Sequence, residues 1–344
     1  MKVMITGVAG FIGSHAASLF MDRGASVVGI DNLSRLGTSE NLEWLRSRSS
    51  TFEFIWADIR QTNDVRHVFA RHCDIDVILH LAAQVAVTTS VIDPWLDFEV
   101  NALGTLNVLE AMREYCPHAA LLYASTNKVY GGMGGTRVAE SQGRYTYRDL
   151  PQGIGEDFPL DFYSPYGCSK GAADQYVRDY SRIFGLKTVV FRQSCIYGTR
   201  QLGVEDQGWL AWFVIATVLA KPLTIYGDGK QVRDVLWVDD LVDLYFKALD
   251  KIEVANGQVY NAGGGPENTL SLWEFVSLLE SQMGLKINPR MADWRPGDQR
   301  VFISDISKAN RELGWAPEVS PLSGVRQLIE WTMASRDFLR TLFV

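Results

Sequence analysis

The sequence has few of the features that mark secreted, membrane-bound or metal-dependent proteins. It contains four cysteines: Cys73, Cys116, Cys168 and Cys195. No pair of them has a CxxC spacing, and this scatter predicts reduced thiols rather than a disulfide framework. The five histidines show no metal-ligand pattern, so we expect no metal. No apolar run could span a bilayer and the N-terminus does not fit a signal peptide, so we expect a cytoplasmic protein with no membrane partner.

Nucleic acid is also a poor candidate as a partner. The net charge is −7, and acidic and basic residues are mixed along the chain without a basic stripe. An anionic small molecule would therefore need a local positive pocket.

Short apolar runs alternate with helical patterns over the first 200 residues. The strand-like runs are KVMITG (2–7), ASVVGID (25–31), FEFIWADI (52–59), DVILHLAA (76–83), AALLYAST (119–126) and KTVVFRQS (187–194). Such alternation predicts a parallel sheet covered by helices on both faces. The predicted fold class is therefore α/β, with a doubly wound parallel sheet of the Rossmann type and a smaller C-terminal substrate-binding region.

The chain length allows one large domain or two closely packed regions. We expect residues 1–185 to form the nucleotide-binding region, with residues 132–163 as an insertion over the site. Residues 186–344 should be mainly substrate-binding, with some strands returning to the sheet. Helices are predicted there at 208–220, 238–250, 270–284 and 320–339.

The segment TGVAGFIG places Gly7, Gly10 and Gly13 between the first strand and the first helix. Small residues let the backbone approach a pyrophosphate, and the helix N-terminus supplies N–H donors to it. Asp31 ends the second strand, where a carboxylate accepts hydrogen bonds from a ribose diol and repels a 2′-phosphate. The pattern favours NAD over NADP, and Arg35 is the counter-signal because it could hold a 2′-phosphate.

Other residues at these strand ends are weaker candidates for cofactor binding. Asp58 either hydrogen-bonds the adenine or caps the next helix. Ala82 and Ala83 either allow close approach of the cofactor or simply pack. The complete set of cofactor-binding candidates is Gly7, Gly10, Phe11, Ile12, Gly13, Asp31, Asn32, Asp58, Ile59, Leu81, Ala82, Ala83, Tyr166 and Lys170.

The stretch from Ser164 to Gly185 predicts a long helix with a serine cap and a glycine stop. Tyr166 and Lys170 are four residues apart and share one face. An ammonium beside a phenol favours the phenolate, so we expect a lowered pKa for Tyr166 and a role as general base. A Tyr-x-x-x-Lys pair also arises by chance, and it gains weight only beside the nucleotide fingerprint. Thr126, at the end of a central strand, completes the candidate catalytic set.

These motifs together resemble the extended short-chain dehydrogenase/reductase family of nucleotide-sugar enzymes. The resemblance runs from TGVAGFIG through YGCSK to RPGDQRVFISDISKANRELGW, nearly the whole chain. It implies tightly held NAD, a Thr–Tyr–Lys centre, a nucleotide sugar bound between the two regions, and a homodimer or homotetramer. It also implies that Arg233 and Arg295 hold the diphosphate, although either could form a surface ion pair instead. Cys195 departs from the family pattern, where an asparagine is usual.

Asn127 and Lys128 limit the reactions that the family resemblance allows. Relatives that dehydrate the sugar carry Asp and Glu directly after the catalytic threonine, and an amide and an ammonium cannot replace those acids. Redox-neutral epimerisation remains, and a narrower resemblance to 2-epimerases of CDP-hexoses implies inversion at C2. A UDP-sugar C4 epimerase and a non-catalytic NAD-binding regulator are the alternatives. We expect Asn127 and Lys128 to face the sugar, unless Lys128 points to solvent or pairs with an acid such as Glu156.

Overall fold

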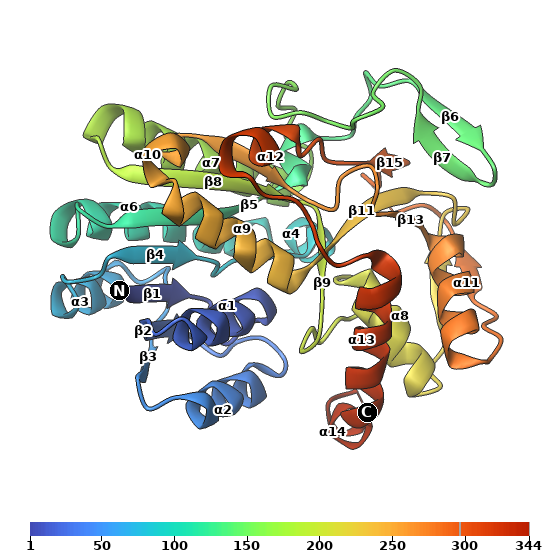
Figure 1. Ribbon diagram of the computed structural model, residues 1–344, viewed down its shortest axis with the longest axis horizontal. Coiled ribbons are helices and arrows are strands. Elements are labelled where there is room, and N and C mark those ends of the chain that lie inside the picture. Colours follow the sequence, from blue (N-terminus) through green and yellow to red (C-terminus); the bar gives the residue numbers. More distant parts are fainter. Residues whose placement is uncertain (296, 344) are drawn as a thin grey trace.

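Seven parallel strands form the central sheet of the computed structural model, which describes residues 1–295 and 297–343 (Figure 1). The strands are β1 (Lys2–Thr6), β2 (Ser26–Asp31), β3 (Phe52–Trp56), β4 (Val77–His80), β5 (Ala120–Thr126), β8 (Lys187–Gln193) and β12 (Val259–Ala262). Their order across the sheet is β3-β2-β1-β4-β5-β8-β12, and it reverses direction between β1 and β4. Ligands bind beside such a reversal in open α/β sheets. The predicted doubly wound parallel sheet is confirmed.

Helices cover both faces of this sheet and bury a separate apolar core on each. One face carries α1 (Phe11–Asp22), α2 (Thr38–Arg48), α9 (Val238–Asp250), α10 (Ile252–Ala255) and α12 (Ser307–Leu313). The other carries α3 (Thr62–Arg71), α6 (Gly104–Tyr115) and α7 (Ser164–Phe184). Alternate residues of β1 divide between the cores, since Val3 and Ile5 join the first and Met4 the second. Burial on both sides explains why the strand sequences are almost continuously apolar.

The helix before β5 departs from the predicted pattern. The chain forms α4 (Val87–Ile92) and α5 (Pro94–Phe98), and the turn Glu99–Leu103 then adopts π-helical geometry before α6 begins. Single π turns of this kind are frequent at functional sites. The turn includes Asn101, whose amide bonds the backbone oxygen of Gln84 at 3.0 Å.

The C-terminal region has its own small sheets and its own core. Its strands are β9 (Cys195–Tyr197), β10 (Thr224–Tyr226), β11 (Val232–Trp237), β13 (Thr269–Ser271), β14 (Arg290–Ala292) and β15 (Val301–Phe302). Its helices are α8 (Trp209–Val218), α11 (Leu272–Met283), α13 (Pro321–Ala334) and α14 (Arg336–Leu342), grouped beside the large sheet in Figure 1. The predicted helix 320–339 is divided at Ser335, where the chain turns from α13 into α14.

Residues 127–147 link β5 to the C-terminal region. A short 3₁₀ turn, η2 (Asn127–Tyr130), follows β5, and the hairpin of β6 (Val138–Ser141) and β7 (Arg144–Tyr147) lies at the upper right of Figure 1. The hairpin is held by the C-terminal region, because Arg144 pairs with Glu274 at 3.1 Å and the Tyr145 hydroxyl donates to Asp228 at 2.6 Å.

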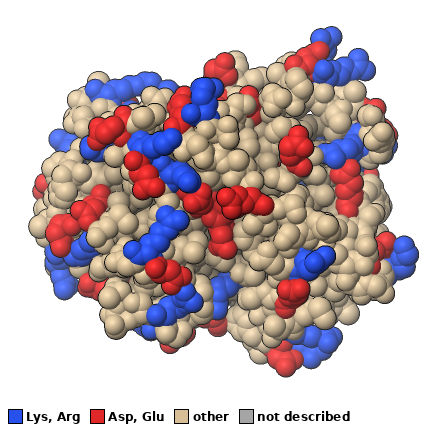
Figure 2. Space-filling model, in the orientation of Figure 1, with Lys and Arg blue, Asp and Glu red and all other residues tan. Residues whose placement is uncertain are grey.

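The surface seen in Figure 2 carries interspersed acidic and basic side chains, without a continuous basic stripe on that face. Among the helices of the described residues, none is long and apolar enough to cross a membrane.

Candidate functional site

Two glycines at the turn from β1 into α1 are packed too closely against backbone to carry a side chain. Gly7 has a φ of 72°, and a Cβ there would lie 2.8 Å from the backbone nitrogen of Ala82. A Cβ on Gly13 would lie 2.1 Å from the oxygen of Gly7. Within the described residues no side chain caps the start of α1 at Gly10, so the N–H groups of its first turn are available to a ligand. This arrangement fits a pyrophosphate.

Asp31 lies at the end of β2 beside this loop. Its carboxylate accepts the N–H of Ala9 at 3.0 Å and that of Leu33 at 2.8 Å. Burial raises its pKa despite these bonds. A carboxylate has about four acceptor positions, so two remain for a ribose diol. The guanidinium of Arg35 donates to the side-chain oxygen of Gln207 in the C-terminal region.

Asp58 follows β3 and is held by side chains. It accepts hydrogen bonds from the guanidinium of Arg60 at 2.7 Å and from the amide of Asn32 at 3.1 Å. Burial alone would raise the pKa of Asp58, but the bonds from Arg60 outweigh it and lower the pKa. Asp58 also caps the turn that follows it, because its carboxylate accepts the backbone N–H of Arg60 at 3.0 Å, although the N-cap of α3 itself is Gln61.

The remaining cofactor candidates lie near the carboxyl ends of the same strands. Phe11 and Ile12 form the half-buried first turn of α1, and Ile59 is buried beyond β3. Leu81, Ala82 and Ala83 follow β4; the first two are fixed by Thr6, whose backbone and hydroxyl oxygens accept their N–H groups, each at 3.2 Å. The structure therefore gathers these predicted residues at one edge of the sheet.

The long helix α7 brings Tyr166 and Lys170 to the carboxyl end of β5, where Thr126 lies. Tyr166 is 8% exposed and Lys170 is 4% exposed. The ammonium of Lys170 donates to the oxygen of Ala124 at 2.6 Å and lies 4.4 Å from the centre of the Tyr123 ring. The Ser164 hydroxyl accepts the N–H of Gly167 at 3.2 Å, which satisfies one donor in the first turn of the helix.

The expected lowering of the Tyr166 pKa is wrong. Burial raises it to about 12, although a hydrogen bond from Thr126 acts in the opposite direction. Burial also lowers the pKa of Lys170 to about 7. Removal from water disfavours both charged forms, and it outweighs the attraction that the four-residue spacing suggested. The carboxylates of Asp174 and Asp97 act against this effect and favour the charged form of Lys170.

The sequence reasoning missed a buried polar group behind Lys170. Asp97, 1% exposed, accepts the hydroxyl of Ser169 at 2.5 Å and the amide of Gln84 at 2.8 Å. Asn101 donates to the same serine oxygen at 3.1 Å. The sequence did contain a signal for this group. Asp97 and Asn101 are four residues apart in a segment where a helix should bury apolar residues. The π turn that aims Asn101 inward leaves no mark in the sequence.

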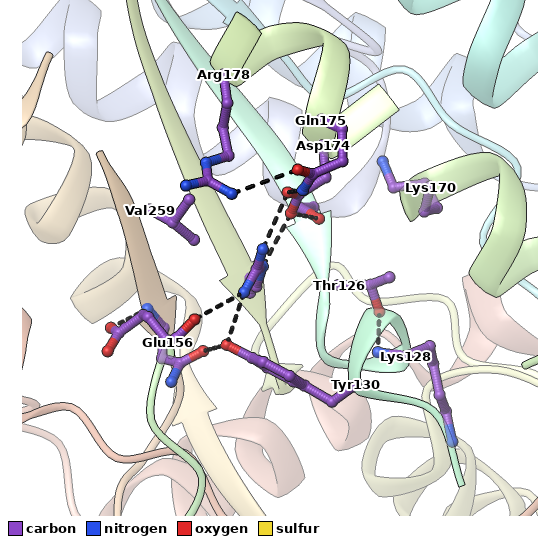
Figure 3. A network of polar contacts seen from close by, with 12 residues as sticks. Thr126, Lys128, Tyr130, Glu156, Lys170, Asp174, Gln175, Arg178 and Val259 are labelled. Carbon is purple, nitrogen blue, oxygen red and sulfur yellow. Dashed lines mark hydrogen bonds and ion pairs between the residues drawn. The ribbon is translucent and has the colours of Figure 1, made fainter. Parts of the chain in front are cut away.

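A second buried network fixes the segment that follows Thr126 (Figure 3). Arg192 of β8 forms two hydrogen bonds with Asp174 of α7, at 3.0 and 3.1 Å, and both side chains are almost fully buried. The same guanidinium donates to the hydroxyl of Tyr130 at 3.2 Å. Because this ion pair joins β8, α7 and η2, it holds the catalytic helix against the strand end.

Asn127 and Lys128 are both turned into the protein. Asn127 is 7% exposed, and its side-chain oxygen lies 3.5 Å from the hydroxyl of Thr126. The ammonium of Lys128 donates to Gln299 at 3.4 Å, and burial followed by repulsion from Arg233 lowers its pKa to about 8. The alternative pairing with Glu156 is wrong, because Glu156 instead accepts the backbone N–H of Asn261 at 2.7 Å. Lys128 itself is partly exposed.

The two candidate diphosphate arginines have different neighbours. Arg233, whose side chain is 11% exposed, forms an ion pair with Asp298. Arg295 pairs with Asp206 at 3.1 Å and stacks over the ring of Tyr226 at 4.0 Å. The described structure therefore gives each arginine an acidic partner, which a bound phosphate would have to share or displace. Cys195 lies in β9, directly beside Val235 of β11.

Comparison with known proteins gives consistent results along the whole chain. A family model described as GDP-mannose 4,6 dehydratase matches residues 4–328. A protein named CDP-paratose 2-epimerase, from Salmonella typhi, is 48% identical over 337 residues, which cover 96% of this chain and 99% of that protein. A UDP-glucose 4-epimerase from Mycolicibacterium smegmatis is 33% identical over 331 residues, which cover 96% and 98%.

Solved structures of the same kind superpose on this fold. The crystal structure of UDP-glucose 4-epimerase from Thermotoga maritima with UDP-glucose has a TM-score of 0.85 and 30% identity, and the match covers 98% of this chain and 100% of that one. The Thermus thermophilus UDP-glucose 4-epimerase in complex with NAD has a TM-score of 0.81 and 32% identity, with 96% and 99% covered.

Proposed function

The chain belongs to the family described as GDP-mannose 4,6 dehydratase, among the extended short-chain dehydrogenases/reductases, and on that premise we propose that it is an NAD-dependent epimerase that inverts C2 of a CDP-hexose. The reaction is of the type that converts CDP-paratose to CDP-tyvelose. The cofactor is NAD, since the Thermus thermophilus relative is an NAD complex and Asp31 lies where a ribose diol is bound.

The observation that carries this proposal is the strand end around Thr126. Tyr166 and Lys170 both lie there, and such a pair can transfer a hydroxyl proton. The two residues that follow Thr126 are an asparagine and a lysine, Asn127 and Lys128, rather than carboxylates. Elimination of water from a sugar needs an acid and a base in addition to the redox step. A site that lacks them supports oxidation and reduction at one carbon.

Each side chain then has a defined part. Tyr166 takes the proton of the C2 hydroxyl and returns a proton to the C2 oxygen after the ring has presented its other face. Thr126 orients the phenol, since it acts to lower the Tyr166 pKa against burial. The part assigned to Lys170, when protonated, is to favour the phenolate by its charge. Bound NAD supplies the hydride acceptor, a positive charge that favours the phenolate, and the same hydride for the return step. Asn127 offers a donor and an acceptor to the sugar during the turn.

The second candidate is a UDP-sugar C4 epimerase with the same three catalytic residues. The similarity to solved UDP-glucose 4-epimerases favours it. A non-catalytic NAD-binding regulator is the third possibility, and the intact set of Thr126, Tyr166 and Lys170 argues against it.

A substrate screen separates these functions. The purified protein is incubated with CDP-, UDP- and GDP-hexoses, and the products are identified by NMR. We expect inversion at C2 of a CDP-hexose. Inversion at C4 of a UDP-hexose would select the second candidate, and NAD binding without turnover of any nucleotide sugar would select the regulator.

We further propose a homodimer that pairs the catalytic helix α7 and the neighbouring helices α4 and α5. Large apolar side chains are exposed on α4, α5 and α7: Ile92, Trp95, Phe98, Tyr176, Ile183 and Phe184. An exposed apolar surface of this kind marks an interaction site. Light scattering tests the assembly, and a monomeric mass at micromolar concentration would contradict it. A cytoplasmic location remains a prediction from the four unpaired cysteines.

A further inference from the structure

Lys128 carries a partly buried charge that its neighbours do not neutralise. Its ammonium has one hydrogen-bond partner, the neutral amide oxygen of Gln299, at a long 3.4 Å, and no ion pair joins it to a carboxylate of the described residues. Gln299 is itself 2% exposed and is anchored by its own bond to the oxygen of Gly131 at 2.6 Å. A buried ammonium without an anion is destabilising, so such a group is ready to bind one.

The charges around Lys128 leave an excess of positive charge that favours an anion. Arg233 is close enough to depress the pKa of Lys128, and Asp298 is the acid that opposes this effect. Asp298 is already paired with Arg233. The three side chains therefore carry a net charge of +1 when Lys128 is protonated, and all three are partly buried. Two phosphate oxygens would give both cations a partner.

The side chain of Lys128 leads away from the catalytic threonine. The backbone N–H of Lys128 bonds the hydroxyl of Thr126 at 3.3 Å, so the residue begins at the catalytic centre. Figure 3 shows its side chain extending away from Thr126 and Lys170. The ammonium thus lies away from the catalytic threonine and near enough to Arg233 for that charge to lower its pKa. We infer that a group attached next to the reacting carbon would reach it.

The chemistry of the substrate supplies such a group. In a nucleotide sugar the diphosphate is attached through oxygen to C1, which neighbours C2, whereas C4 lies across the ring from C1. When C2 is held against Tyr166, the phosphate next to the sugar lies close to the end of β5. When C4 is held there, the same phosphate is displaced by about the width of the ring. A cation directly after Thr126 therefore suits C2 and not C4.

Resting on the proposed function, we propose that Lys128 and Arg233 together bind the sugar-proximal phosphate of the substrate, and that Lys128 thereby selects C2 as the carbon that is oxidised. Gln299 is a positioning residue that holds the ammonium in place. Lys128 is thus a determinant of regiochemistry, which acts through the position of the phosphate rather than on the C2 oxygen.

The test compares phosphate binding in Lys128→Met with that in the unaltered protein. Affinities for CDP and CMP are measured by calorimetry on NAD-loaded protein. We expect CDP to bind about tenfold more weakly to the variant, the loss of one charge-assisted hydrogen bond, while CMP affinity stays within about twofold. Lys128→Arg should restore most of the CDP affinity. Lys286→Met, which removes a side chain that is 85% exposed, is the matched control and should change neither affinity.

Three outcomes would overturn the proposal. CDP affinity could be unchanged while turnover falls, which would indicate that Lys128 acts on the reacting C2 oxygen instead of the phosphate. CDP and CMP could weaken equally, which would indicate a structural effect. Lys128→Met could also retain both CDP affinity and C2 turnover. Should Lys128→Met lose its NAD or its cooperative unfolding, Lys128→Gln replaces it under the same criteria.

Failure of the proposed function is recognised separately. The unaltered protein would then bind nucleoside diphosphates and NAD but would not invert C2 of any CDP-hexose. The binding comparison uses no turnover, so it would still report whether Lys128 contacts the phosphate.

Discussion

The proposed cofactor surface, at the ends of β1 and β4, consists of glycine and alanine, whereas the proposed substrate surface, at the end of β5 and in β11, presents lysine and arginine. The first surface is defined by close backbone packing, because a Cβ at Gly7 or Gly13 would clash with neighbouring backbone atoms. The second is defined by side chains from segments far apart in the sequence, such as Lys128 with Gln299 and Arg233 with Asp298.

This difference explains how proteins with the same fold can bind the same cofactor but act on different substrates. A backbone cradle depends on a short continuous motif and tolerates little variation. A pocket assembled from several loops can alter one charge at a time, so the reacting carbon can change without any change to the sheet. Four predictions compare the effects of changes in different parts of the molecule, beginning with the largest expected effect.

Tyr166→Phe removes the acid–base group and leaves the cofactor loop intact. We expect a loss of about 10²–10⁴ in the rate of epimerisation, the usual contribution of a positioned proton-transfer group. The NAD content, measured after denaturation, should not change. A near-normal rate in the folded variant would assign the proton transfer to another residue.

Asp174→Ala breaks the buried ion pair that holds α7 against β8. The change leaves the buried Arg192 without an anionic partner, which should cost about 3–5 kcal/mol in the free energy of unfolding. Urea denaturation of the NAD-loaded protein measures it. A loss below about 1 kcal/mol would show that the pair is not what fixes the catalytic helix.

The affinity for CDP should depend on pH through Lys128. Its pKa is lowered to about 8, so it loses its proton at a lower pH than an ordinary lysine. Because Arg233 keeps its charge, we expect CDP affinity to fall by no more than about tenfold between pH 7 and pH 9.5, the value of one charged contact. Lys128→Arg should flatten this profile, and a profile that is the same in both proteins would contradict the assignment.

Asp149→Ala breaks an exposed ion pair, and its small effect on the free energy of unfolding is compared with that of Asp174→Ala. Asp149 pairs with Arg137 in the insertion, and the two side chains are 47% and 73% exposed. Pairs in contact with solvent contribute about 0–1 kcal/mol, so we expect urea denaturation to detect little change. A loss equal to that of Asp174→Ala would remove the contrast between the buried and exposed pairs.

The sequence predicted the cofactor side more fully than the substrate side. The strands and the glycine loop follow from local patterns, because buried strands and tight turns restrict residue type. The Tyr166 pKa was predicted with the wrong sign, because helical spacing reveals a neighbouring charge but not the depth of burial. The π turn at Asn101 and the partnership of Lys128 with Gln299 depend on tertiary packing, and no local pattern encodes them.

The central claim is that one carbon of the sugar is oxidised and then reduced by return of the same hydride. The most direct measurement is to run the epimerisation of a CDP-hexose in D₂O and to examine C2 of the product by NMR. Because Tyr166 exchanges only the oxygen-bound proton, we predict that C2 retains its original hydrogen and acquires no deuterium. Stoichiometric deuterium at C2 would mean that the carbon is deprotonated and reprotonated by solvent-exchanging groups, and it would contradict the account.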